Sequence, residues 1–135
     1  GGREKAPAAI ARKFVEAKNS NQDTVSIWGT GTATREFLFV KDCAQAILLA
    51  TEKYNQSEPV NLGSNHEISI KDLAKKISQL VGFKGQIIWD KSKPDGQPRR
   101  KLDTTKARQE FGFTANTNFD QGLKQTIQWY LSSLE

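Results

Sequence analysis

The chain has 135 residues, a formal net charge of +5 and a mean hydropathy of −0.62, and its length suits one domain with a modest core. It contains no apolar run near the ~18 residues that a membrane-spanning helix needs, and its single cysteine and single histidine argue against a structural zinc site. The basic excess is compatible with an anionic partner such as a phosphorylated small molecule, a nucleic acid or an acidic surface.

The first half of the chain predicts four regular elements: a helix over residues 7–18, strands over residues 25–28 and 36–40, and a helix over residues 42–54. Pro7 suits the first turn of the first helix, because its missing N–H would be unpaired there in any case. Between the two strands, Gly29-Thr30-Gly31 predicts a tight turn. Asp42 suits the amino-terminal end of the second helix.

The second half predicts a strand over residues 59–62, a helix from Ser69 to Gly82, a strand over residues 86–89, and helices over residues 104–111 and 118–133. Ser69 and Asp72 have the spacing of a capping box, in which two side chains pair with free N–H groups at a helix start. Residues 90–102 (DKSKPDGQPRRKL) have no period and predict a loop. We therefore expect one small mixed α/β domain over residues 1–135, whose short strands belong to a sheet with further strands elsewhere.

The chain lacks the motifs of cofactor binding and catalysis. Residues 29–34 (GTGTAT) come near the dinucleotide fingerprint, but the third glycine is missing and a strand, rather than a helix, follows the turn. The pyrophosphate of a dinucleotide binds at a helix amino terminus, so this segment does not predict a dinucleotide site. No Tyr-x-x-x-Lys pair occurs. We expect Cys43 to be a buried small hydrophobe and His66 to lie at the surface, and we identify no catalytic residue and no metal site.

Trp28 and Arg35 bracket the tight turn and are the first candidates for ligand binding. An indole face can stack on a purine base, and a guanidinium can contact two phosphate oxygens at once. Together they can hold a nucleoside diphosphate. The structural alternative is a Trp28 side chain in the core and an Arg35 side chain paired with a carboxylate, and the local sequence leaves both open.

The loop over residues 90–102 combines rigid prolines with many cations, which is the composition of a lid that closes over an anion. The candidate lid residues are Lys93, Asp95 and Arg99. The alternative is a solvated run of charge. Asp103 follows the loop directly and can either cap the next helix or accept hydrogen bonds from sugar hydroxyls or base amines.

Several segments resemble the nucleotide-sugar epimerases of the extended short-chain dehydrogenase/reductase superfamily. Residues 28–42 (WGTGTATREFLFVKD) resemble that family's segment W-G-[ST]-G-x-x-x-R-[ED]-F-[LI]-x-V-x-D, and residues 60–63 (VNLG) resemble its N-[VL]-G turn. Residues 92–99 (SKPDGQPR), with Leu102-Asp103, more narrowly resemble the GDP-L-fucose synthases, the 3,5-epimerase-4-reductases that act on GDP-4-keto-6-deoxy-D-mannose. The similarity covers nearly all of residues 7–134.

The resemblance implies that the chain is the carboxyl-terminal, substrate-binding part of such an enzyme, without most of the Rossmann sheet. The family's substrate contacts carry over to Lys13, Trp28, Arg35 and Asp103, of which Lys13 by itself is typical of a solvated lysine. Family members bind NADP through an amino-terminal Rossmann half that also holds their Ser, Tyr and Lys. We therefore expect NADP for the parent enzyme and no cofactor on this chain alone. The family's second proton-transfer histidine precedes the first helix, where this chain has residues 3–5 (REK). Family members are commonly dimers, which makes a homodimer a candidate for the full-length enzyme.

The expected function is the GDP-sugar-binding half of an NADP-dependent enzyme that makes GDP-L-fucose. Two alternatives stay open: the substrate part of another epimerase or dehydratase that uses a UDP- or dTDP-sugar, and a non-catalytic nucleotide- or RNA-binding module. Only Trp28 and Trp89 lie at strand ends where they can stack on bases, so nucleic acid is the weaker candidate. No signal-peptide pattern opens the sequence and the single cysteine suits a reducing compartment, so we expect a cytoplasmic protein without a membrane partner.

Overall fold

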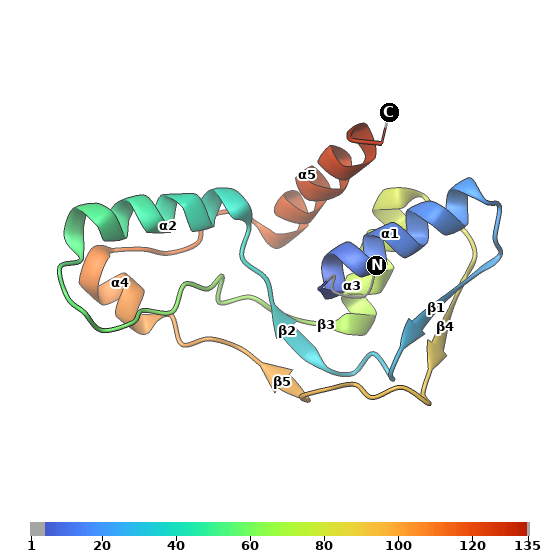
Figure 1. Cartoon of the computed structure of the whole chain (residues 1–135), viewed down its shortest axis with the longest axis horizontal. Helices are drawn as coiled ribbons and strands as arrows, with labels where there is room; N and C mark the ends of the chain where they lie inside the picture. Colours follow the sequence, from blue (N-terminus) through green and yellow to red (C-terminus); the bar gives the residue numbers. More distant parts are fainter. Residues whose placement is uncertain (1–4, 135) are drawn as a thin grey trace.

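The structure is a computed structural model that describes residues 5–134. Its helices are α1 (Ala6–Asn19), α2 (Val40–Lys53), α3 (Ile70–Val81), α4 (Thr105–Phe111) and α5 (Phe119–Ser132), and its strands are β1 (Thr24–Trp28), β2 (Thr34–Glu36), β3 (Glu67–Ser69), β4 (Gln86–Asp90) and β5 (Arg99–Arg100). α1 and α3 lie with β1 and β4 at one end of an elongated molecule, α2 and α4 lie at the other end, and β2, β3 and β5 run between them (Figure 1). The arrangement confirms the expected small mixed α/β fold.

The strands form two small sheets. β1 and β4 pair in parallel, from Thr24 opposite Gln86 to Trp28 opposite Asp90. β2 is the middle strand of the other sheet, antiparallel to β3 and parallel to β5. β1 continues through the Gly29–Gly31 turn into β2, and β4 continues through the loop into β5, so the turn and the loop run side by side from one sheet to the other (Figure 1).

The larger core packs α1, α3 and α5 against β1 and β4. Its largest fully buried side chains are Phe14, Leu73 and Ile77. α3 begins as the sequence predicts, because Ser69 Oγ accepts the Asp72 N–H at 3.0 Å and donates to Asp72 Oδ2 at 2.7 Å. It ends at Gly82, whose φ of 76° suits a residue without a Cβ. The predicted Ser69 cap and the stop signal are confirmed, whereas Asp72 accepts the Ser69 hydroxyl instead of the backbone N–H that a complete capping box uses.

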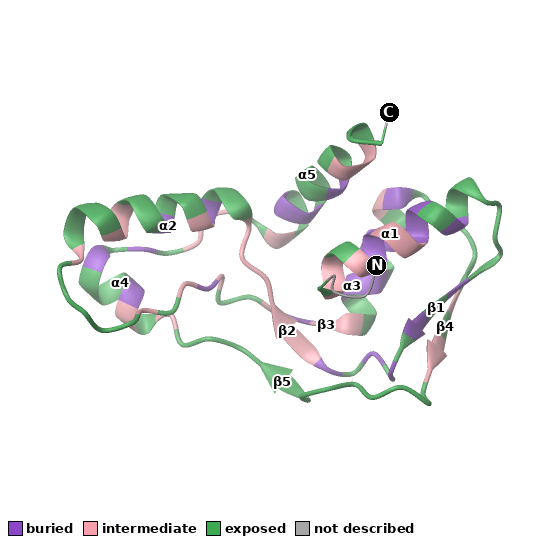
Figure 2. Ribbon diagram, viewed as in Figure 1, coloured by how far each residue is buried: buried purple, intermediate pink, exposed green. Residues whose placement is uncertain are grey.

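The smaller core lies between α2 and α4, where Ala46, Ala107, Phe111 and Phe113 are buried. Asp42 in the first turn of α2 is buried as well, and its carboxylate accepts the Thr117 N–H at 3.2 Å and the Thr117 hydroxyl at 2.9 Å. These bonds satisfy the buried charge and tie the start of α2 to the segment before α5. Most of the outward surface of α2 is nevertheless exposed (Figure 2).

The strand predicted over residues 36–40 is wrong. β2 ends at Glu36 and α2 already begins at Val40. Phe37 packs on the larger core while Leu38 packs on the smaller one, so these apolar residues bridge two cores instead of pairing with a neighbouring strand.

The strand predicted over residues 59–62 is also wrong. Val60 and Leu62 pack on the smaller core, but the segment pairs with no strand in the part of the chain that the structure describes. β3 and β5 were not predicted, because two or three residues are too few to show a period of two.

The other predicted elements, the five helices and the strands over 25–28 and 86–89, form within two residues of their expected ends. Cys43 is half-buried rather than buried, because it lies on the flank of α2. Among residues 5–134, no helix has both the length and the apolar character needed to cross a bilayer.

Candidate functional site

The Gly29–Gly31 turn has no room for side chains at either glycine. Both glycines have positive φ, 85° and 79°. A Cβ on Gly31 would lie 2.7 Å from the Trp89 ring, and a Cβ on Gly29 would collide with the Asp95 carboxylate. The turn therefore depends on glycine for both conformation and space.

Asp95 fastens the neighbouring loop onto this turn. We call residues 91–98 the strap. The Thr30 N–H donates to Asp95 Oδ1 at 2.7 Å, and the Thr30 hydroxyl donates to Asp95 Oδ2 at 2.7 Å. These bonds, the hydroxyl first and the backbone second, hold the pKa of Asp95 below its usual value. The Thr30 N–H at the centre of the turn is thus occupied by an aspartate of the same chain.

This arrangement does not fit a dinucleotide. The turn leads into strand β2 rather than into a helix, and its Thr30 N–H faces a carboxylate. A pyrophosphate needs free N–H groups at a helix start. The described turn over residues 29–31 is therefore not an NADP-binding turn.

Arg35 lies half-buried in the middle of β2. Its Nη1 donates to the carbonyl oxygens of Thr34 and Gln97, both at 2.7 Å. The Thr34 N–H also donates to Pro98 O at 2.9 Å, so the end of the strap runs along β2. Within residues 5–134 these carbonyls, and no carboxylate, are the partners of the guanidinium. Its positive charge is held in place without being neutralised.

Trp28 ends β1 with 63% of its surface exposed, which rules out the core placement. Two ammonium groups lie near its ring, Lys13 Nζ at 6.0 Å and Lys93 Nζ at 5.6 Å from the ring centroid. Lys13 Nζ also donates to Ser26 O at 2.8 Å. The structure thus brings together three predicted residues, an open indole face and two cations, in an arrangement that suits an aromatic anion.

Arg100 is one of the cations of the predicted loop over residues 90–102, and the structure adds its position beside Arg35. It pairs with Arg35 across the parallel strands β2 and β5, so the two side chains leave the same face of the sheet. It is exposed. The pairing is visible only in the structure, since β5 is two residues long.

Arg99, a predicted lid residue, is committed to an ion pair. Its Nε and Nη2 donate to the two carboxylate oxygens of Glu67 at 2.8 and 2.9 Å. The Thr34 hydroxyl also donates to Glu67 at 2.6 Å. The Arg99 and Thr34 bonds lower the pKa of Glu67 to about 2. This cluster links β2, β3 and β5 and leaves Arg99 less free for a ligand.

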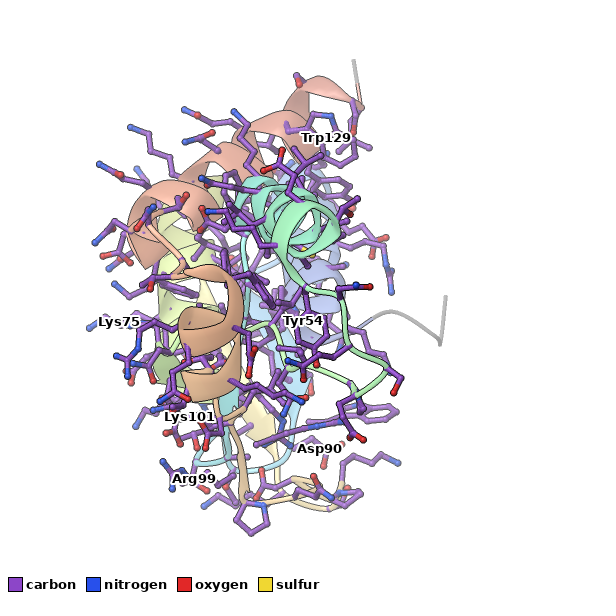
Figure 3. All side chains as sticks on the ribbon, turned by 90° about the vertical axis from the view of Figure 1, so that its left-hand side faces the viewer. Tyr54, Lys75, Asp90, Arg99, Lys101 and Trp129 are labelled. Carbon is purple, nitrogen blue, oxygen red and sulfur yellow. The ribbon has the colours of Figure 1, made fainter. Side chains whose placement is uncertain are left out.

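Asp103 follows β5 and caps α4, since its Oδ1 accepts the Thr105 N–H at 2.9 Å. That backbone bond is the largest cause of a lowered Asp103 pKa. The residue also lines an open cavity of about 480 Å³ with Lys101 and Arg108. Arg99 and Lys101 lie low in the view of Figure 3, on the opposite side of the molecule from Trp129. Asp103 therefore holds the start of α4 and also faces this cavity.

A second cavity, of about 680 Å³, lies where α2, α3 and α5 approach β2. Glu36 lines it, and its Oε2 is buried without a hydrogen-bond partner among the described residues. His66 lies at the surface, as predicted, and its ring stacks on Phe119 at a centroid distance of 4.8 Å. Residues 3 and 4, which stand in the region of the family's histidine, lie outside the described residues.

The chain is similar in sequence to a known protein family and to named enzymes. Residues 1–63 match the NAD dependent epimerase/dehydratase family. Over 126 residues the chain is 44% identical to a putative GDP-L-fucose synthase 2 of Arabidopsis thaliana, covering 93% of this chain and 38% of that protein. It is 37% identical to the GDP-L-fucose synthase of Escherichia coli, covering 93% and 41%.

The fold of the chain is similar to that of a solved enzyme structure. The chain superimposes on a GDP-L-fucose synthetase from Naegleria fowleri, solved with NADP, with a TM-score of 0.89 and 27% identity over 96% of this chain and 41% of that one. The chain therefore spans about two fifths of the length of the relatives it matches.

Proposed function

We propose that this chain, whose residues 1–63 match the NAD dependent epimerase/dehydratase family, is the GDP-sugar-binding part of a longer nucleotide-sugar epimerase/reductase. The observation that carries the proposal is the grouping of Lys13 and Lys93 around the exposed ring of Trp28. Lys93 lies on the strap, which also contacts Arg35 through the Gln97 carbonyl. The relatives named GDP-L-fucose synthase support the GDP-sugar, and their activity suggests a parent that makes GDP-L-fucose from GDP-4-keto-6-deoxy-D-mannose.

Each of these residues has a role in binding. The purine stacks on Trp28, and base–aromatic stacking is worth roughly 1–3 kcal/mol. Arg35, with Lys13 and Lys93, neutralises the diphosphate through charge-assisted hydrogen bonds of about 1.5–3 kcal/mol each. Asp103, which lines the open cavity, accepts a ligand hydroxyl. Lys93, Asp95 and Arg99 belong to the segment that covers the ligand.

NADP and the proton-transfer groups belong, in this proposal, to the remaining part of the parent protein, which we place in the cytoplasm as a homodimer. Hydride transfer requires that cofactor. The Naegleria relative, whose crystal structure is described as bound to NADP, supports this cofactor for the parent. The 135-residue chain by itself then binds the nucleotide sugar without converting it.

The exposed apolar surface of α2 supports the proposal that another part of the parent protein covers this helix. One side of the helix packs on α4, while Val40, Ile47 and Leu48 on other sides are 71%, 55% and 65% exposed. An exposed apolar face on a helix that also carries polar residues marks an interaction site. The unpaired Val60–Leu62 segment beside the smaller core offers backbone groups for an added strand. We place the Rossmann part of the parent on this side.

Calorimetric titration of the full-length protein with GDP and with UDP tests the proposal. GDP is expected to bind at least tenfold more tightly than UDP. Arg35→Ala should weaken GDP binding about tenfold or more, since it removes a charge-assisted contact. Lys124→Ala is a matched control, because this exposed lysine lies on α5. Equal GDP affinity in wild type and Arg35→Ala would contradict the proposal, and tighter UDP binding would assign the chain to a UDP-sugar enzyme.

A further inference from the structure

We infer that Asp95 is a positioning residue of this nucleotide site, which holds the strap against the Gly29–Gly31 turn and so fixes Lys93 beside Trp28 and Gln97 beside Arg35. The inference rests on the proposed function and extends it from the residues that touch the ligand to a residue that holds them in place.

The contact between Asp95 and the turn is a two-point attachment. Both carboxylate oxygens accept hydrogen bonds from the same residue, one from the N–H and one from the hydroxyl of Thr30. Gly29 leaves the space that the carboxylate fills, because a Cβ there would collide with it. Turn and strap therefore fit together in one relative position.

Asp95 lies between the two strap residues that reach the site. Two positions before it, Lys93 places its ammonium 5.6 Å from the centroid of the Trp28 ring. Two positions after it, the Gln97 carbonyl accepts a hydrogen bond from Arg35 at 2.7 Å. Gly96 is in the left-handed region with φ 74°, which turns the strap sharply between Asp95 and Gln97. Loss of the hydrogen bonds of Asp95 would therefore loosen both Lys93 and Gln97.

The charge of the Asp95 carboxylate makes the direction of the change in GDP affinity informative. It is a negative charge near the proposed diphosphate, and by simple electrostatics its removal should tighten binding. If its role is positioning, neutralisation should instead weaken binding, because preorganised contacts become free to move. The sign of the change in affinity thus separates positioning from plain charge.

The test compares Asp95→Asn with wild type in the full-length protein, by GDP titration and by amide hydrogen exchange without ligand. An asparagine cannot accept both Thr30 bonds, so we expect GDP affinity to fall about five- to tenfold. The Thr30 amide should exchange at least about tenfold faster. Asp23→Asn is the matched control, because this exposed aspartate precedes β1 at the end of the strand away from the turn, and it should leave both values within about twofold.

Variants of Thr30 complete the test. Thr30→Ser keeps both hydrogen bonds and should retain GDP affinity, whereas Thr30→Val loses the hydroxyl bond and should weaken it. Thermal melting confirms that each variant is folded, so a change in affinity reports on the site.

The outcomes separate the two proposals. Unchanged Thr30 exchange in Asp95→Asn overturns the attachment, and unchanged or tighter GDP binding overturns the positioning role. If Arg35→Ala still weakens GDP binding in either case, the proposed function stands without this inference. If wild type binds no GDP while Thr30 exchange still depends on Asp95, the proposed function fails and Asp95 is a structural residue only.

Discussion

Arg35 in β2 and Arg100 in β5 are register partners in a parallel pair, so two cationic side chains leave neighbouring positions on one face of the sheet. Like charges at paired positions repel each other. The two hydrogen bonds of Arg35 use Nη1 and go to neutral carbonyls, which hold the group but do not cancel its charge. A bound diphosphate between the two guanidinium groups would relieve the repulsion, so we predict that Arg100 is a second phosphate contact.

Arg100→Ala should therefore weaken GDP binding by the full-length protein about tenfold, as one charge-assisted contact is lost. Combining it with Arg35→Ala should give a loss that departs from the sum of the single losses, since both residues face one ligand group. Calorimetry on the three variants and on Lys124→Ala measures this. Unchanged affinity in Arg100→Ala would show that the ligand does not lie between the two arginines.

Two exposed tryptophans offer a matched pair for the base-stacking role. Trp28 is 63% exposed beside two lysines. Trp129 is 70% exposed on α5, on the side of the molecule away from Arg99 (Figure 3). Trp28→Ala should weaken GDP binding about tenfold through lost stacking, whereas Trp129→Ala should leave affinity within about twofold. Equal effects of the two substitutions on the dissociation constant would argue against stacking on Trp28.

Gly31 and Gly112 separate conformational strain from steric collision. Both have left-handed φ, 79° and 70°, but a Cβ on Gly31 would meet the Trp89 ring at 2.7 Å, while a Cβ on Gly112 would meet nothing within 4 Å. Gly112→Ala should cost about 1 kcal/mol of unfolding free energy, and Gly31→Ala about 1–3 kcal/mol more, because the indole must shift. Urea unfolding measures both. Equal costs would mean that Trp89 yields without strain.

The helices could be predicted because their signals are local. Ser69 accepts the Asp72 N–H at the start of α3, as their spacing indicates, and Asn118 accepts N–H groups at the start of α5. Glycine ends α3 and α4 in the left-handed conformation. Each of these interactions spans a few residues, so the sequence contains all that is needed to recognise it.

The site was predictable in its residues but not in its connections. Trp28 and Arg35 stand in a recognisable segment, yet the bond of Asp95 to Thr30 and the pairing of Arg100 with Arg35 each span 65 positions. Such contacts depend on the whole fold. The strand expected over residues 59–62 illustrates the same limit, since a strand needs a neighbour and its composition does not supply one.

The ion pair of Glu67 with Arg99 should make stability depend on pH in the acidic range. Because the folded pKa of Glu67 is about 2, below its ordinary 4.5, the pair contributes stability fully above pH 4.5 and loses it as the pH falls toward 2. Glu67→Gln should be less stable than wild type at neutral pH, with a difference that shrinks toward pH 2. Urea unfolding at several pH values checks this against Glu52→Gln, an exposed glutamate of α2. A difference that is constant with pH would contradict the pairing.

Leu48 provides a test of the partner proposed for α2. It is 65% exposed in this structure, and truncating a leucine at such a position changes the free energy of unfolding by no more than about 0.5 kcal/mol. If the Rossmann part of the parent covers this face, Leu48→Ala in the full-length protein leaves a cavity and should cost about 2 kcal/mol or more. Gln45→Ala, an exposed polar position of the same helix, is the control and should stay within about 0.5 kcal/mol. Denaturant unfolding of the full-length protein distinguishes the two cases. A cost for Leu48→Ala as small as that for Gln45→Ala would show that α2 faces solvent in the parent as well, and the Rossmann part would then have to attach elsewhere.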